Sequence, residues 1–85
     1  MATSNVSILK DSGWVVVSSA AKVFATNQGS GIIEYCWNNS DPIEPFKPII
    51  LYPSYGVNRD FETGALRMRN NSPIDEIIVT VDEGV

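Results

Sequence analysis

The sequence contains no histidine and only one cysteine, Cys36, among its 85 residues. An intrachain disulfide is therefore excluded, and the commonest general base and metal ligand of proteins is missing. We expect no metal and no other cofactor. A domain of this length buries only about 60–65% of the surface that its unfolded chain exposes. Association with a partner is the remaining device that adds stability to so small a fold.

Basic residues are few and scattered. Six Lys and Arg stand against ten Asp and Glu, which gives a net charge of -4 and a pI near 4.5. Nucleic acids and anionic membranes select for clustered Lys and Arg, so we expect neither of them as a partner. Only Arg67 and Arg69 share one face of a predicted strand, and we interpret that face as a solvated polar surface.

Long apolar runs and a secretion signal are also missing. The longest apolar runs, residues 14–17 and 48–52, are too short to cross a bilayer. The first residues lack the basic stretch and the following apolar segment of a secretory signal peptide. We therefore expect synthesis in the cytoplasm.

Apolar residues at helical spacing are absent, whereas strand signals fill the chain. Short runs of β-branched and aromatic residues are interrupted by Gly, Asn and Pro, a pattern typical of all-β sandwiches and barrels. We predict one all-β domain, residues 1–85, that forms a small antiparallel β-sandwich or a compact barrel of about seven short strands. The predicted strands are residues 6–9, 14–18, 22–26, 32–37, 49–52, 65–69 and 76–82.

Two segments between these strands are candidates for contact with a partner. Pro42, Pro45 and Pro48 cannot donate ladder hydrogen bonds, so their segment is expected at a sheet edge or at a crossover between sheets. Residues 53–63 form the longest stretch without a clear strand, where a contact loop is expected. The polar residues 2–5 are expected to extend towards a neighbour. The candidate contact residues are Tyr52, Tyr55, Phe61 and Pro45.

Two similar segments, residues 38–43 and 70–74, each begin with Asn-Asn-Ser and continue to Pro-Ile. Asn and Ser side chains bond to nearby backbone, and Pro fixes the following bend. We predict two turns of similar type.

No catalytic residue is predicted. Cys36 lies in the middle of a strand and has no histidine to lower the pKa of its thiol, so we interpret it as a small core residue. We interpret the Asp and Glu side chains as solvated residues of the loops. A calcium site at Asp60 and Glu62 is a weaker alternative, because the dense oxygen-ligand spacing of a calcium loop is missing. Among the aromatic residues, Trp14 and Tyr35 are expected to be core anchors.

Five stretches carry a resemblance to known proteins. They are Gly-Trp-Val-Val-Val at 13–17, a strand ending in Asn-Gln-Gly at 23–29, Ile-Glu-Tyr at 33–35, Leu-Arg-Met-Arg-Asn at 66–70 and Ile-Val-Thr-Val-Asp-Glu at 78–83. This layout resembles the small β-sandwich virion proteins of tailed bacteriophages, such as capsid decoration proteins, head-fibre bases and tail adaptors. The resemblance implies a non-enzymatic protein that assembles as a trimer or ring with other virion proteins.

Two hypotheses of function follow. The first is a structural virion component that decorates or stabilises the capsid, or joins a head or tail fibre assembly. The second is a free-standing carbohydrate- or receptor-binding module in which Tyr52, Tyr55 and Trp37 form the binding face, because flat amphipathic rings suit sugars and peptides. An enzyme is a third and weaker alternative, against which the lack of histidine speaks.

Overall fold

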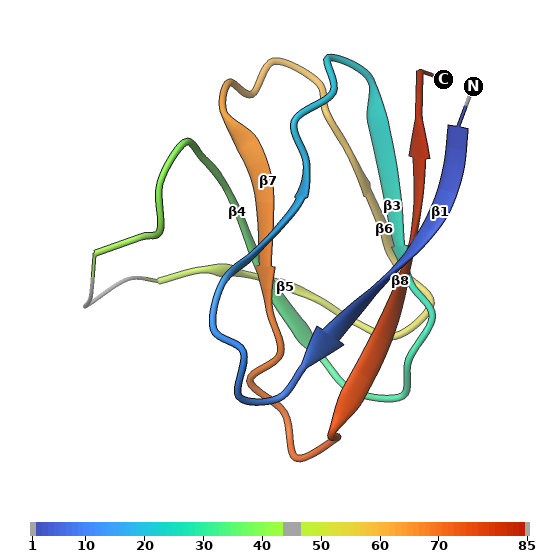
Figure 1. Ribbon diagram of the computed structural model, residues 1–85, viewed down its shortest axis with the longest axis vertical. Helices are drawn as coiled ribbons and strands as arrows, with labels where there is room; N and C mark the ends of the chain where they lie inside the picture. Colours follow the sequence, from blue (N-terminus) through green and yellow to red (C-terminus); the bar gives the residue numbers. More distant parts are fainter. Residues whose placement is uncertain (1, 44–46, 85) are drawn as a thin grey trace.

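The computed structural model describes residues 2–43 and 47–84, and these residues form a two-sheet β-sandwich (Figure 1). The prediction of an all-β fold is confirmed: the described residues contain antiparallel strands and no helix. The eight strands are β1 (Ala2–Leu9), β2 (Val15–Ser18), β3 (Val23–Asn27), β4 (Ile33–Asn38), β5 (Ile49–Leu51), β6 (Gly56–Asn58), β7 (Ala65–Arg69) and β8 (Glu76–Glu83).

The strand order is that of one long antiparallel hairpin, in which the first half of the chain pairs with the second half and the whole folds into two sheets. Strand β1 pairs with β8, β2 with β7, β3 with β6 and β4 with β5. Two further pairings, β3 with β8 and β4 with β7, join these four strand pairs into two sheets. They are sheet A (β1-β8-β3-β6) and sheet B (β2-β7-β4-β5). This order is that of a double-sheet jelly roll, an architecture found in viral capsid proteins, lectins and cupins.

The core lies between the two sheets and is built from alternate residues of each strand. Ile77, Val79 and Val81 of β8 face inward from sheet A and are almost completely buried. Leu66 and Met68 of β7 face them from sheet B and are likewise buried. Because successive side chains of a strand point to opposite faces, the intervening residues of these strands form the outer faces.

Two segments outside the predicted strands belong to strands. Residues 2–5 are not a free arm, because they form the first half of β1 and pair with β8 from Glu83 to Thr80. Within residues 53–63 lies β6, which pairs with β3. Gly and Asn are depleted in strands, which is why the sequence pattern hid β6. A side chain at position 56 would meet the ring of Phe24, because a Cβ on Gly56 would lie 2.5 Å from Cζ of that ring.

A buried asparagine, Asn27, connects the end of β3 to sheet B. Its side-chain nitrogen donates to the carbonyl oxygens of Gly31 at 2.9 Å and Leu51 at 3.1 Å. Its side-chain oxygen accepts from the amide of Gly29 at 2.9 Å. One carboxamide therefore shapes the β3–β4 turn and holds β5 in place.

A second buried asparagine, Asn70, does the same between β7 and sheet A. Its nitrogen donates to the carbonyl oxygens of Ile74 at 2.9 Å and Ile8 at 3.1 Å, and its oxygen accepts from the amide of Ser72 at 3.1 Å. The prediction that residues 38–43 form the matching turn is wrong, because Asn38 is exposed and its side-chain oxygen accepts from the adjacent amide of Asn39 instead of the amide two residues further on. The turn that matches residues 70–74 is 27–31.

Candidate binding surfaces

Two exposed tyrosines stand together on the turn that leads from β5 in sheet B to β6 in sheet A. The side chains of Tyr52 and Tyr55 are 54% and 64% exposed. Their rings contact edge to face, with centroids 6.0 Å apart and planes at 66°. We name residues 52–55 the tyrosine turn. Its contact with a partner stays a prediction.

Backbone hydrogen bonds hold the tyrosine turn rigidly against β3. The amide of Tyr55 donates to the carbonyl of Tyr52 at 3.1 Å, which closes the turn. The amide of Ser54 donates to the carbonyl of Asn27 at 2.9 Å, and the amide of Asn27 donates to the carbonyl of Tyr55 at 3.0 Å. Ser54 takes a left-handed conformation with φ 70°. The two rings are therefore presented from a fixed backbone, so that binding through them would cost little backbone entropy.

The other candidate contact residues do not join this turn. Phe61 is 92% exposed and belongs to the loop after β6, whereas the tyrosine turn precedes β6. The loop after β6 and the turn between β5 and β6 lie at opposite ends of β6 (Figure 1). Pro45 lies outside the described residues. Trp37 packs against the core, and the guanidinium of Arg59 lies 4.8 Å from the centre of its ring. Trp37 is thus a structural residue and not part of a shared aromatic platform with Tyr52 and Tyr55.

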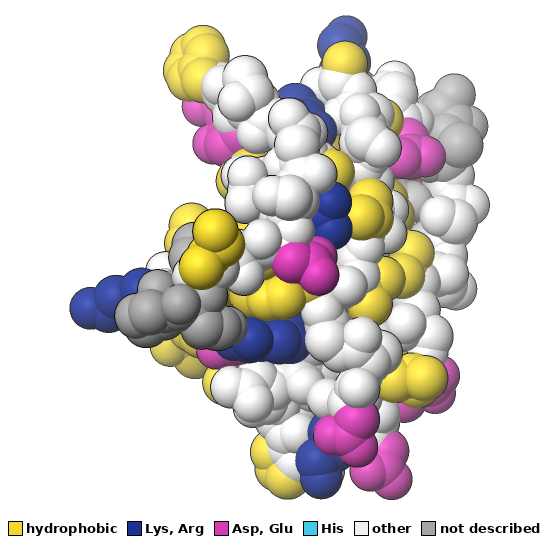
Figure 2. Space-filling model, turned by 60° about the vertical axis from the view of Figure 1, so that its left-hand side comes forward, with side chains coloured by type: hydrophobic (Ala, Val, Ile, Leu, Met, Phe, Trp, Pro, Cys, Tyr) yellow, Lys and Arg dark blue, Asp and Glu magenta, His cyan; other side chains and the backbone are white. Residues whose placement is uncertain are grey.

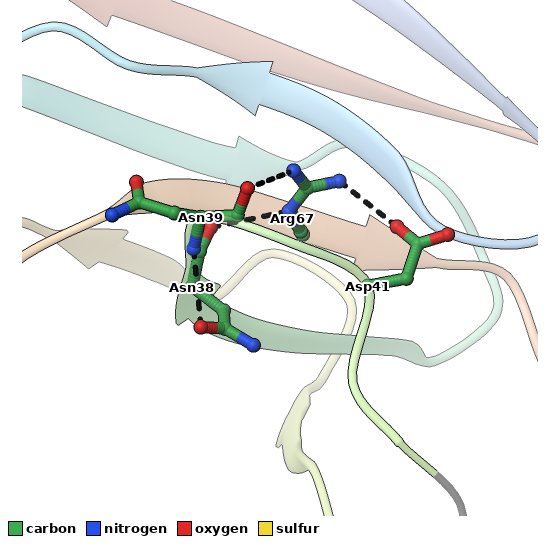
Figure 3. Close-up of polar contacts among 4 residues, drawn as sticks. All are labelled: Asn38, Asn39, Asp41 and Arg67. Atoms are coloured by element: carbon green, nitrogen blue, oxygen red, sulfur yellow. Dashed lines mark hydrogen bonds and ion pairs between the residues drawn. The ribbon is translucent and has the colours of Figure 1, made fainter.

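The outer face of sheet B is organised by Arg67 (Figure 3). Its guanidinium donates to the carbonyl oxygens of Asn38 at 3.1 Å and Asn39 at 3.0 Å, and to the carboxylate of Asp41 at 2.9 Å. The arginine side chain is only 14% exposed, whereas that of Asp41 is 64% exposed. The interpretation of this arginine as freely solvated is wrong: it fastens the segment after β4 onto the neighbouring strand.

Arg69 lies on the same face and is also held. It pairs with Glu34, directly opposite in the register of β4 and β7, at 2.7 Å. Its guanidinium stacks 4.6 Å from the centre of the ring of Trp14. Trp14 is therefore a partly buried residue of the outer face, and the expectation that it anchors the core is wrong. Tyr35, which packs against the core from β4, fulfils that expectation.

Cys36 is buried beside Arg67, on the outer side of β4. Burial raises the pKa of its thiol, and the nearby guanidinium of Arg67 only partly opposes that shift. Because the thiolate is the nucleophilic form of cysteine, this site disfavours nucleophilic chemistry. Burial likewise raises the pKa of the Tyr35 hydroxyl, and the negative charge of Glu62 adds to the shift.

The acidic residues that the structure describes do not converge on a cation site. Glu62 accepts a hydrogen bond at 2.7 Å from the amide of Asp60, and such backbone hydrogen bonds lower the pKa of its carboxyl. Within residues 2–43 and 47–84, no three carboxylate or thiol groups gather in a way that could hold a metal ion. On the face drawn in Figure 2, the basic side chains do not gather into one patch either.

Comparison of the chain with protein-family models, curated proteins and solved structures gives no match. In the described part of the chain, no helix has the length and apolar character needed to cross a membrane.

Proposed function

We propose that this protein is a non-enzymatic structural component of a bacteriophage virion, which decorates or stabilises the capsid or joins a head or tail fibre assembly. The observation that carries the proposal is the tyrosine turn, a pair of exposed aromatic rings on a hydrogen-bonded backbone. Tyrosine is enriched among the few residues that supply most of the binding energy in protein interfaces. The turn therefore forms the contact with another virion protein.

The fold and the charge agree with this proposal. Jelly rolls occur in viral capsid proteins. Because the same fold serves other functions, the surface supports the proposal more strongly than the fold does. A net charge of -4 with dispersed basic residues favours protein partners over nucleic acid or membrane. The protein is made in the host cytoplasm and becomes part of the particle, where a trimer or ring is the proposed form.

The test is co-sedimentation of the purified protein with capsids and tails of the phage that encodes it. We expect Tyr52→Ala and Tyr55→Ala each to weaken binding by about tenfold or more. Phe61→Ala is the control, because it removes a ring that is even more exposed, on the loop at the other end of β6. Absence of binding by the unaltered protein, or equal binding by all variants, would contradict the proposal.

The second candidate is a free-standing carbohydrate- or receptor-binding module. The edge-to-face arrangement of Tyr52 and Tyr55 favours this second candidate, since two rings at an angle can contact two sides of a small ligand. Glycan-array binding that disappears in Tyr55→Ala, together with no affinity for particles, would replace the first candidate with this one.

A further inference from the structure

The long edge strand β1 has an open side. All eight of its residues pair with β8 on one side. No other strand of the described residues pairs with the opposite side, because β1 is the end of sheet A. Thr3, Asn5 and Ser7 are exposed, and Leu9 is half exposed. A free strand edge presents unpaired N–H and C=O groups to which another strand can add.

The other three edges of the sandwich are protected, whereas β1 is not. Strands β5 and β6 have three residues each and have Pro48 and Pro53 close by in the chain. Strand β2 has four residues, and its register shifts between Val16 and Ser18. Strand β1 has neither a proline, nor a charged residue, nor a break in register. Proteins protect edges with short strands, charges, prolines and bulges, and none of these devices is present in β1.

The direction of the free backbone groups follows from the pairing with β8. Lys10 continues the register of β1, and its amide donates to the carbonyl of Asp75 at 2.9 Å. In an antiparallel pair, hydrogen-bonded residues alternate with residues whose backbone groups point the other way. The even-numbered residues therefore bond to β8. The N–H and C=O groups of Thr3, Asn5, Ser7 and Leu9 point to the open side.

We propose that β1 pairs antiparallel with β1 of a second copy of this chain, around a two-fold axis through Val6. This inference rests on the proposed assembly function and names one of its partners. The register centred on Val6 makes full use of the open edge, because Asn5 then exchanges two backbone hydrogen bonds with Ser7 of the second copy, and Thr3 does so with Leu9. The two copies of sheet A become one continuous sheet.

The side chains of β1 suit this pairing with itself. Val6 packs partly against the core, and the Val6 side chains of the two copies meet at the axis on the core side of the sheet. Because β1 carries no charge, no like charges face each other. Lys10 lies opposite Ala2 of the second copy, in the row that also contains Glu83. Lys10 of one copy and Glu83 of the other therefore lie in the same row of cross-strand neighbours, with Ala2 between them. The two-fold axis repeats this arrangement at the other end of the interface.

One strand pair alone forms a small interface. Stable complexes bury about 1,200 Å² or more, so we expect a dissociation constant on the order of 10–100 µM. Such an affinity gives little β1 pairing in dilute solution and more at the high local concentration of a particle surface. A two-fold contact joins only two copies, so the β1 pairing is separate from the contacts of the proposed trimer or ring.

Two matched double variants test the register. Asn5→Lys with Ser7→Glu places opposite charges face to face across the proposed interface, whereas Asn5→Lys with Ser7→Lys places like charges there. Both variants lose the same side-chain contacts, from Thr80 to Asn5 and from Ser7 to Glu76. Sedimentation velocity from about 1 µM to 1 mM measures the association of each. Circular dichroism confirms that both fold.

We expect the unaltered protein and the opposite-charge variant to dimerise, and the like-charge variant to associate at least about tenfold more weakly. As a second measurement, Val6→Cys treated with oxidised glutathione should form a disulfide-linked dimer, whereas Ser4→Cys should not. A protein that stays monomeric at 1 mM, or equal association of the two charge variants, would overturn this inference. All these variants keep Tyr52 and Tyr55, so a monomer that still binds particles through the tyrosine turn overturns the β1 pairing alone.

Discussion

Asn27 and Asn70 make the same three kinds of contact at two different crossings between the sheets. Each side-chain oxygen accepts from the amide two residues further on. Each side-chain nitrogen donates to the carbonyl four residues further on and to a carbonyl at a strand of the other sheet. Both side chains are almost completely buried. The two carboxamides therefore act as polar connections through an otherwise apolar interior.

Removal of either carboxamide should strongly destabilise the fold. We expect Asn70→Ala and Asn27→Ala each to lower the free energy of unfolding by about 2–4 kcal/mol, because buried backbone groups lose their partners. Asn71→Ala is the control, since that residue is exposed, and it should change stability by less than about 0.5 kcal/mol. Urea denaturation measures all three. A change in Asn70→Ala as small as that of the control would contradict the role of the buried carboxamide.

Arg67 should hold the segment after β4 mainly through its two carbonyl contacts. We expect Arg67→Lys to lower the free energy of unfolding by about 1–2 kcal/mol, because a lysine cannot reproduce the planar set of hydrogen-bond donors of the guanidinium. Hydrogen exchange of residues 38–43 should become faster in that variant. Asp41→Asn should lower the free energy of unfolding by less than about 0.5 kcal/mol, since the Asp41 carboxylate is largely exposed to solvent. If the two variants cost the same, the ion pair and not the carbonyl contacts holds the segment.

Two glycines should respond differently to the addition of a methyl group. A Cβ at Gly29 would lie 2.6 Å from Cγ2 of Ile77, which is fully buried and has no room to move. Gly29→Ala should therefore cost about 1–3 kcal/mol. A Cβ at Gly56 would lie 2.5 Å from Cζ of Phe24, whose ring is 39% exposed and can turn away. Thermal unfolding should show the smaller loss for Gly56→Ala, and the reverse order would contradict this packing.

The burial of Cys36 should make the protein less stable at alkaline pH. Burial raises the pKa of the Cys36 thiol in the folded protein. The contribution of this thiol to stability is therefore complete below the pKa of the unfolded thiol, about 8.5. That contribution is lost as pH rises from there through the folded pKa. We expect the free energy of unfolding to fall as pH rises above about 8.5, and to fall less in Cys36→Ala. Tyr35 shifts in the same direction, but only from about pH 10. If the free energy of unfolding falls equally steeply with pH in the unaltered protein and in Cys36→Ala, Cys36 is not the group responsible.

The sequence predicted the fold where alternation of apolar residues is clear. In residues 76–82, Ile77, Val79 and Val81 alternate with more polar neighbours, and the strand and its inward face both follow from that pattern. Leu66 and Met68 were placed inward by the same reasoning. The strand order could not be predicted, because β1 and β8 pair across almost the whole chain and no local pattern records such a pairing.

The polar parts of the structure were harder to predict. Asn70 resembles an ordinary turn residue, and only the fold shows that its carboxamide is enclosed between two sheets. Arg67 alternates with inward residues in the manner of a solvated side chain, and its contacts come from the end of β4 and the segment after it, which are distant in the sequence. Tyr52 and Tyr55 were named because they flank Pro53 at a strand end, and the structure adds that their rings touch. Their exposure was predictable, but their rigidity was not.

The most direct test of the proposed function is quantitative mass spectrometry of gradient-purified virions from the phage that encodes this chain. The account predicts peptides of this chain in the intact particles, in a fixed ratio to the other structural proteins and resistant to washing in salt. If the peptides occur in infected cells but are absent from the purified particles, the assignment as a virion component is wrong.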